Sequence, residues 1–145
     1  MPYWYAVYHS RSKYKLYQER KQATKGCPFC DPNEINYRLR EETEHMYIVP
    51  NQTKYEVWEQ HKVIEHLLLI PKRHVSTLGE FTDTEVLDMA RLAGKYEDMG
   101  YSVYSRANVN PRRSVSHQHT HLVKIDPKSP KLHFYLKKPY VMVNF

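Results

Sequence analysis

A chain of 145 residues with 41% hydrophobic residues is long enough to fold as one domain with its own core. No apolar run approaches the roughly 18 residues of a membrane span, and the N-terminus lacks the long apolar stretch of a signal peptide. We therefore expect a cytoplasmic protein without a membrane partner. The net charge of +6 favours anionic partners such as nucleotides, polyphosphates or nucleic acid, although a solvated basic surface would give the same value.

The N-terminal segment is rich in tyrosine, lysine and arginine. Residues 11–23 contain no glycine or proline, which predicts a short basic helix. We interpret residues 1–26 as a basic extension of a single domain, residues 27–125 as its core and residues 126–145 as a C-terminal tail.

Two cysteines open the core in the motif Cys27-Pro28-Phe29-Cys30. Two thiols cannot form the disulfide framework of a small secreted protein. Their spacing suits a redox pair or a metal-binding knuckle, but a redox pair is expected within a thioredoxin-like βαβ pattern, which this sequence lacks. A metal-binding knuckle is the better interpretation, provided that distant residues supply the other ligands.

Five segments of the core have the composition of β-strands: residues 37–41, 46–49, 62–70, 101–106 and 115–125. Thr43-Glu44-His45 would connect the first two as a hairpin, and Pro50 would end the second. The apolar run Leu67-Leu68-Leu69-Ile70 predicts a strand buried on both faces. Two further strand-like segments, residues 132–136 and 140–143, lie in the tail.

One long helix is predicted between about residues 83 and 99. Thr82-Asp83-Thr84-Glu85 has the form of a capping box, and Gly100 fits a C-terminal cap. Between them, apolar residues recur at helical spacing, at Val86, Met89, Ala90, Ala93 and Tyr96. Strands around a single long helix, without a repeating βαβ unit, predict an α+β fold with an antiparallel sheet of about five strands.

Three histidines alternate near the end of the core, at His117, His119 and His121. Alternation is the period of a β-strand, so their rings are predicted to project from one face, with neighbours about 7 Å apart. Imidazole can act as a nucleophile, an acid, a base or a metal ligand near neutral pH. Three such rings on one face indicate a functional site.

The segment from His117 to Val123 resembles the His-φ-His-φ-His-φ-φ motif of the histidine-triad (HIT) family, in which φ is usually apolar. Gln118 and Thr120 are polar exceptions. Three other stretches are similar to the family: His66-Leu67-Leu68-Leu69-Ile70-Pro71-Lys72-Arg73-His74, residues 77–82 before the helix, and Ser114-Val115. The similarity covers residues 27–125. It implies a HIT-like fold and a homodimer in which two sheets join.

Cys27-Pro28-Phe29-Cys30 looks like the motif of zinc-carrying family members. The resemblance implies one Zn²⁺ bound by Cys27, Cys30, His74 and His117. Two thiolates and two neutral imidazoles complete a tetrahedral zinc shell and leave no open position. The metal is therefore expected to be structural rather than a Lewis acid. The alternative is that the cysteines are ordinary small apolar residues.

Within the triad, His119 is the candidate nucleophile, because a neutral imidazole can attack phosphorus and form a nucleotidyl-histidine intermediate. The resemblance implies that His121 supports and orients the nucleophile and the phosphate. The nucleotidyltransferase branch typically carries glutamine at this third position, so hydrolysis is expected. The predicted activity is that of a HIT-type nucleotide hydrolase that attacks an α-phosphate and releases a nucleoside monophosphate.

Four more residues are candidates for contact with the substrate: Ser114, Arg113, Asn108 and His66. Ser114 would bind a phosphate through its hydroxyl and backbone N–H. Arg113 stands where many family members carry an amide, and it either grips a phosphate or points to solvent. Asn108 is expected near the same phosphate. His66 either supports the active site or is a core or edge histidine.

Two alternatives remain open. A nucleotidyltransferase or phosphorylase would use the same residues with a different acceptor. A basic zinc-containing domain would instead bind nucleotide or nucleic acid without turnover, or combine both properties and remove adenylate from nucleic-acid ends, as repair-type family members do. Nucleic acid is therefore kept as an alternative partner, and a nucleotide is the favoured one.

Overall fold

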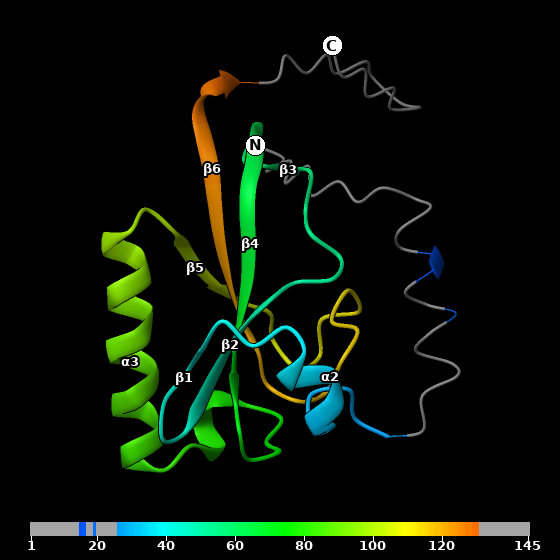
Figure 1. The fold of residues 1–145 in the computed structure, drawn as a ribbon, viewed down its shortest axis with the longest axis vertical. Coiled ribbons are helices and arrows are strands. Elements are labelled where there is room, and N and C mark those ends of the chain that lie inside the picture. Colours follow the sequence, from blue (N-terminus) through cyan, green and yellow to red (C-terminus); the bar gives the residue numbers. More distant parts are fainter. Residues whose placement is uncertain (1–14, 17–18, 20–25, 131–145) are drawn as a thin grey trace.

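The computed structural model describes residues 15, 16, 19 and 26–130, and these form an α+β fold. Among them, six strands make one antiparallel sheet in the order β1-β2-β4-β6-β5, and β3 pairs with β4 outside this path. The strands are β1 (Glu41–Glu42), β2 (Met46–Pro50), β3 (Val57–Trp58), β4 (His61–Pro71), β5 (Ser102–Ser105) and β6 (Thr120–Pro130). The helices are α2 (Pro32–Asn36), the 3₁₀ helix η1 (Leu78–Glu80) and α3 (Asp83–Asp98). Figure 1 shows the sheet between α3 and α2.

The centre of the sheet is the pair of β4 and β6, each 11 residues long. In β4, Leu67 and Leu69 pack against α3, whereas Leu68 and Ile70 pack on the opposite face near Phe29. These four β4 side chains are at most 4% exposed. The predicted strand buried on both faces is therefore confirmed, because the alternation of a strand sends an unbroken apolar run into both cores.

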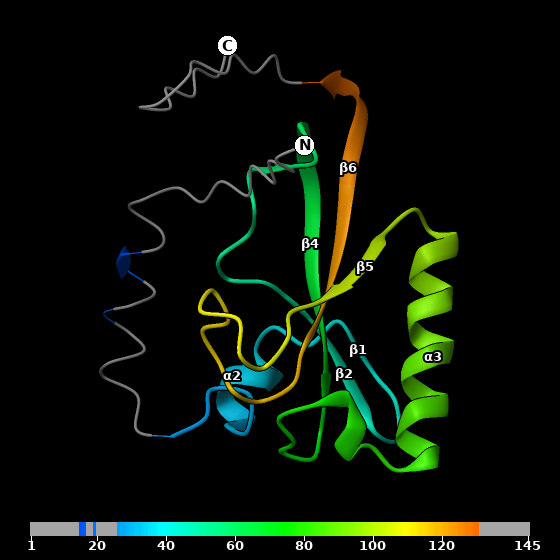
Figure 2. The ribbon, with the colours of Figure 1, turned by 180° about the vertical axis from the view of Figure 1, so that it is seen from behind.

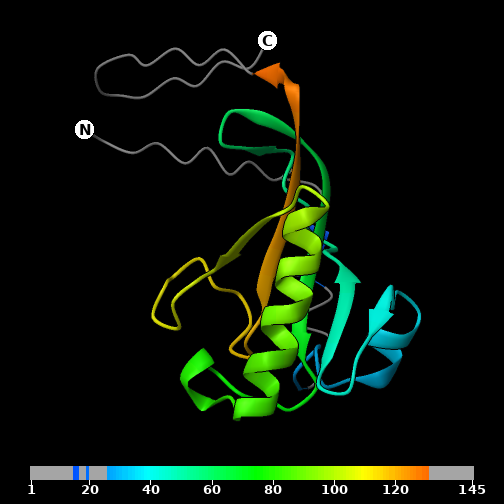
Figure 3. The same ribbon diagram turned by 90° about the vertical axis from the view of Figure 1, so that its left-hand side faces the viewer.

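The long helix α3 begins at the predicted capping box and lies against one face of the sheet (Figure 3). The Thr82 hydroxyl accepts a hydrogen bond from the Glu85 backbone N–H, and the Glu85 carboxylate accepts one from Thr82 N at 2.8 Å. Arg73 donates two more bonds to this carboxylate, at 2.9 and 2.7 Å, and lowers the pKa of Glu85 to about 2. Gly100 follows the helix with a φ of +88°, a left-handed conformation that suits glycine.

The strand predicted at residues 37–41 forms only at its end, as β1, which pairs with β2 across the predicted connection at residues 43–45. A short helix, α2, comes first, with Asp31 as its N-cap and Pro32 as its first residue. The Asp31 side chain accepts a hydrogen bond from Asn33 N at 2.9 Å, and the proline ring fixes a helical φ. The chain then turns at Tyr37 and joins the sheet only at β1. The cap and the proline outweigh the strand-like composition that follows them.

The last strand of the core begins later than predicted. β6 starts at Thr120 rather than at residue 115, and it runs past the predicted end to Pro130. Residues 115–119 have no regular secondary structure. Figure 2 shows the segment that joins β5 to β6 (yellow) on the same side of the sheet as α2. Of the three alternating histidines only His121 lies on a strand, so the prediction of one regular face for all three is wrong.

Hydrogen bonds outside the sheet explain this late start. Arg113 donates to the carbonyl oxygens of Val115 and Ser116, at 3.1 and 2.6 Å. The backbone N–H of Gln118 donates to the carbonyl oxygen of Val75 at 2.7 Å. Backbone groups that are bonded in this way are withdrawn from the ladder of a strand.

The remaining predicted elements either correspond to strands of the structure or lie outside the described residues. The strands predicted at residues 46–49, 62–70 and 101–106 correspond to β2, β4 and β5. The helix predicted at residues 11–23 falls mostly outside the described residues, and the two tail strands fall wholly outside them. In the part of the chain that the structure describes, no helix has the length and apolarity to cross a membrane.

Candidate active site and metal centre

His119 lies directly before β6 and is 7% exposed. Its Nδ1 lies 2.9 Å from the carbonyl oxygen of His117. A carbonyl oxygen can only accept, so Nδ1 carries the proton, and the lone pair of the neutral ring is on Nε2. Burial lowers the pKa of His119, and the guanidinium groups of Arg113 and Arg106 lower it further. The ring is therefore held neutral, with its nucleophilic nitrogen at Nε2.

His121 and His66 form a buried pair beside this ring. The Tyr55 N–H donates to His66 Nδ1 at 3.1 Å, so the proton of a neutral His66 ring is on Nε2. That nitrogen lies 2.9 Å from His121 Nδ1, which accepts, and His121 then carries its proton on Nε2. The rings of His121 and His119 meet edge to face with centres 5.1 Å apart, closer than the spacing expected on a regular strand. His66 is thus a member of the hydrogen-bonded chain that fixes the tautomer of His121.

A cleft opens beside His119 and His121, and both rings line it. Its apolar lining comes from Pro28, Phe29, Leu68 and Val115, and the rest of its polar lining from Arg38, Asn51, Gln52, Thr53, Tyr55, Arg106, Arg112 and Ser114. No aspartate or glutamate lines it among the described residues. The positive charge of this lining suits an anionic ligand.

The predicted substrate contacts divide into two groups. Ser114 lines the cleft, whereas Arg113 and Asn108 lie at a neighbouring hollow. The Arg113 guanidinium donates to four backbone carbonyl oxygens, the two nearest being those of Ser116 at 2.6 Å and Ser76 at 2.7 Å. Neither sequence alternative for Arg113 is therefore right, because its guanidinium cross-links the backbone around the triad.

Two arginines that sequence reasoning did not select, Arg106 and Arg112, line the cleft instead. Arg106 directly follows β5, and its guanidinium lies over the rings of Tyr55 and Tyr104, 5.7 and 5.5 Å from their centres. The sequence shows an arginine pair before the triad. It does not show that Arg112, and not Arg113, faces the cleft, because an irregular segment has no fixed period.

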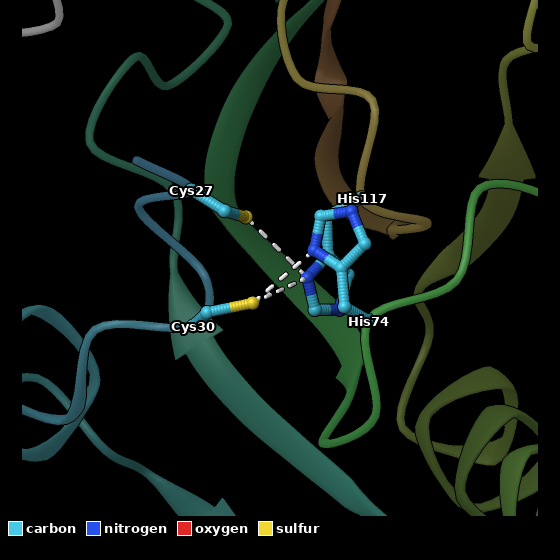
Figure 4. Close-up of side chains that lie close together, drawn as sticks. All are labelled: Cys27, Cys30, His74 and His117. Carbon is cyan, nitrogen blue, oxygen red and sulfur yellow. Dashed lines mark hydrogen bonds between the residues drawn. The ribbon is translucent and has the colours of Figure 1, made fainter. Parts of the chain in front are cut away.

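Four side chains with metal-binding atoms converge beside the triad, and Figure 4 shows them: Cys27, Cys30, His74 and His117. Their ligand atoms all lie within 4.8 Å of one another. Cys30 Sγ lies 3.2 Å from His74 Nδ1 and 3.4 Å from His117 Nδ1, and Cys27 Sγ lies 3.5 Å from the latter. Bonds of about 2.0 to 2.3 Å in a tetrahedron separate neighbouring ligand atoms by about 3.3 to 3.8 Å. This cluster could therefore bind a metal ion.

The chemistry of the donor atoms also fits a metal cation. His117 Nε2 donates to the Pro71 carbonyl oxygen at 2.8 Å, so the lone pair of its neutral ring is on Nδ1, which faces the sulfur atoms. Burial lowers the pKa of His117 to about 4, which keeps this ring neutral. Burial and the neighbouring Cys27 thiol raise the pKa of Cys30 to about 11. A bound dication would offset that rise and favour the thiolate.

No protein-family model matches the chain, and no curated protein matches it either. Solved structures do match. A HIT family hydrolase from Clostridium thermocellum is 23% identical, over 75% of this chain and 98% of that chain, with a TM-score of 0.54. A histidine triad nucleotide-binding protein from Candida albicans is 22% identical, over 80% of this chain and 87% of that chain, with a TM-score of 0.52. A histidine triad protein from Clostridium difficile is 20% identical, over 73% of this chain and 95% of that chain, with a TM-score of 0.50. The chain therefore has the fold of the histidine-triad proteins, as its motifs implied.

Proposed function

We propose that this chain is a HIT-type nucleotide hydrolase in which His119 attacks the α-phosphorus of a nucleotide. The observation that carries the proposal is the 2.9 Å bond from His119 Nδ1 to the His117 carbonyl oxygen, since it leaves the lone pair on Nε2 in a ring that lines the cleft. The fold adds support, because the solved structures that share it include one described as a hydrolase and one described as nucleotide-binding.

The proposed reaction has two displacement steps. In the first, the lone pair of His119 Nε2 forms a bond to the α-phosphorus, and the bond from phosphorus to the leaving group breaks with its electrons going to the leaving group. The hydrogen bond from Nδ1 to the His117 carbonyl offsets the positive charge that develops on the ring. In the second step, water attacks the phosphorus and releases a proton to the solvent. The phosphorus–nitrogen bond then breaks, which restores neutral His119 and releases a nucleoside monophosphate.

His121 and Ser114 are the proposed donors to the phosphoryl oxygens. His121 Nδ1 is occupied by the bond from His66, so the ring presents its proton at Nε2. Ser114 lines the same cleft and can offer a hydroxyl and a backbone N–H. Fixed donors of this kind stabilise negative charge as it develops in the transition state. His66 acts through His121 and is a positioning residue.

We assign the cluster of Cys27, Cys30, His74 and His117 to Zn²⁺ in a structural role. Two sulfur and two nitrogen donors suit zinc and leave it no open position for substrate. The ion would hold the His117 ring, whose own carbonyl oxygen orients His119. Elemental analysis of protein never exposed to chelator should find one zinc per chain, and a value near zero would contradict the assignment.

We also propose a homodimer that uses the edge strand β5 and the helix α3. β5 ends the sheet in the described chain, and it pairs there only with β6. Val86, Leu87, Met99 and Val103 are between 41% and 54% exposed on and near these elements. Exposed edges and apolar side chains are typical of surfaces that a partner covers. Sedimentation equilibrium should give twice the chain mass, and a monomer at all micromolar concentrations would contradict the dimer.

The hydrolase proposal is tested by His119→Ala, with His45→Ala as a matched control outside the cleft. Release of AMP from a panel of adenosine 5′-phosphate derivatives, followed by chromatography, should fall by at least about a thousandfold in His119→Ala, because the nucleophile is removed. Metal content and the free energy of unfolding should remain near the wild-type values. Undiminished turnover in this variant would remove His119 from the mechanism.

A further inference from the structure

We propose that Arg106 and Arg112 bind phosphate groups of the leaving group, so that the substrate is a nucleotide whose α-phosphate is joined to further phosphates by an anhydride bond. The inference rests on the proposed attack by His119 and narrows its substrate class. Phosphoramidates, which lose a neutral amine, would be poorer substrates.

The first support is the charge of the cleft. Three arginines line it, Arg38, Arg106 and Arg112, without an acidic lining residue in the described chain. Arg38 is held at one wall, where it donates to the carbonyl oxygens of Glu34 and Pro50 at 2.7 and 3.0 Å. Arg106 and Arg112 belong to the segment that leads into the triad, and the charge of Arg106 is one of those that lower the pKa of His119.

The second support is that neither arginine has an ion-pair partner among the described residues. Elsewhere, Arg40 and Arg73 each pair with a glutamate carboxylate. Arg106 and Arg112 form no ion pair with any residue that the structure describes. Unpaired guanidinium groups at the wall of a cleft attract anions from solution and are not stabilising the fold through salt bridges.

The third support is the position of Arg106. Its guanidinium lies over the rings of Tyr55 and Tyr104, and these two cation–π contacts hold it at the wall of the cleft. Burial raises the pKa of Tyr55 to about 12, and the charges of Arg106 and Arg112 act against that rise. Both cations are therefore within electrostatic reach of Tyr55, which lines the same cleft as His119.

The leaving group decides whether such cations help the reaction. An amine takes up a proton and departs neutral when the phosphorus–nitrogen bond breaks. A phosphate departs with one more negative charge, because the bridging oxygen keeps the electron pair of the broken bond. Guanidinium groups bind phosphate through paired hydrogen bonds and stabilise that charge as it develops. Two arginines that line the same cleft as the nucleophile therefore favour a phosphoanhydride.

The test compares diadenosine tetraphosphate with adenosine 5′-phosphoramidate as substrates of Arg106→Gln, Arg112→Gln and Arg91→Gln. Arg91 is an exposed arginine of α3 and is the matched control. In each cleft variant, kcat/KM for the tetraphosphate should fall about tenfold or more beyond any fall for the phosphoramidate, because charge-assisted hydrogen bonds are lost. Arg91→Gln should leave the ratio of the two substrates unchanged. Equal falls for both substrates in the cleft variants would overturn the proposal.

A binding measurement separates this inference from the proposed hydrolysis. In a His119→Ala background, titration calorimetry with ADP and with AMP measures what the second phosphate contributes. ADP should bind about tenfold more tightly than AMP, and this advantage should vanish when Arg106→Gln and Arg112→Gln are added. That result supports the arginine site even if the wild type hydrolyses neither substrate, in which case only the hydrolase proposal is wrong. Equal affinities for AMP and ADP, or an arginine-dependent affinity for a single-stranded oligonucleotide alone, would overturn it.

Discussion

The two faces of the sheet are held in different ways. On one face, Leu67 and Leu69 pack against α3, and the regular periods of strand and helix place every side chain. On the other face, irregular segments lie over β4 and β6, and individual hydrogen bonds such as those of Arg113 hold them in place. The first face supplies stability through burial, and the second carries the chemistry. The candidate site therefore depends on a few specific contacts above a robust sheet.

His117 connects the metal cluster to the nucleophile. Its ring belongs to the metal cluster, and its carbonyl oxygen accepts the bond that orients His119. A change at the cluster is therefore transmitted to the nucleophile through a single residue. The α3 face has no comparable residue, because its burial is shared among many side chains.

The largest effect on stability is expected from Leu67→Ala. Leu67 is fully buried on the α3 face, so the substitution should lower the free energy of unfolding by about 2 to 5 kcal/mol through lost burial and a cavity. Turnover per folded molecule should remain unchanged, because no site residue moves. Urea unfolding and an activity measurement corrected for the folded fraction check both parts. Loss of turnover in the folded fraction would mean that the two faces are not separate.

Arg113→Gln, on the other face, should instead lower activity strongly and stability only modestly. Losing hydrogen bonds to backbone carbonyls should cost about 1 to 3 kcal/mol of stability. Displacement of His119 should lower kcat/KM by about a hundredfold, since small misplacements of a catalytic group are costly. Arg91→Gln, an exposed arginine of α3, is the control. Full activity in Arg113→Gln would show that the triad segment is held by other contacts.

Residues on the two faces should also change the free energy of unfolding over different pH ranges. In metal-free protein, the folded pKa of His117 is about 4 against an ordinary 6.5, so the unfolded chain takes up the proton first. The free energy of unfolding should therefore fall as pH falls from 6.5 and should level off near 4. Glu85, in the first turn of α3, has a folded pKa of about 2 against 4.5, so its stabilisation is present above pH 4.5 and is lost as pH falls towards 2.

Urea unfolding across this range separates the two contributions. His117→Gln should flatten the upper part of the profile in metal-free protein, and Glu85→Gln should flatten the lower part. A profile that is unchanged in both variants would contradict the assigned pKa directions.

The smallest effect is expected from Thr82→Ala at the start of α3. The threonine hydroxyl accepts a hydrogen bond from the Glu85 backbone N–H, and its loss should cost about 1 kcal/mol of stability. Activity should not change, because the helix lies on the face away from the cleft. A thermal melt and a turnover assay check this prediction, and any loss of turnover per folded molecule would count against the separation of the faces.

Sequence reasoning was reliable where a regular backbone places the side chains. The apolar run of β4 and the capping box of α3 were predicted correctly, because periods and caps act locally. Residue type and family motif together predicted that Cys27, Cys30, His74 and His117 would meet, and the structure brings them together. Spacing alone could not have done so, because the four residues come from separate segments.

Prediction failed where the backbone is irregular. The triad was expected on one strand, but His117 and His119 precede β6. Arg113 was expected at a phosphate or in solvent, and its guanidinium binds backbone carbonyls instead, while Arg106 lines the cleft. In such a segment, the direction of each side chain depends on long-range hydrogen bonds that no local pattern encodes.

Trapping the covalent intermediate tests the central claim most directly. Protein mixed with diadenosine tetraphosphate is quenched at alkaline pH, where a phosphorus–nitrogen bond survives, and its peptides are analysed by mass spectrometry. We predict one adenylyl group on His119, absent from His119→Ala. An adenylyl group on another residue, or rapid release of AMP without any modified peptide, would contradict the account.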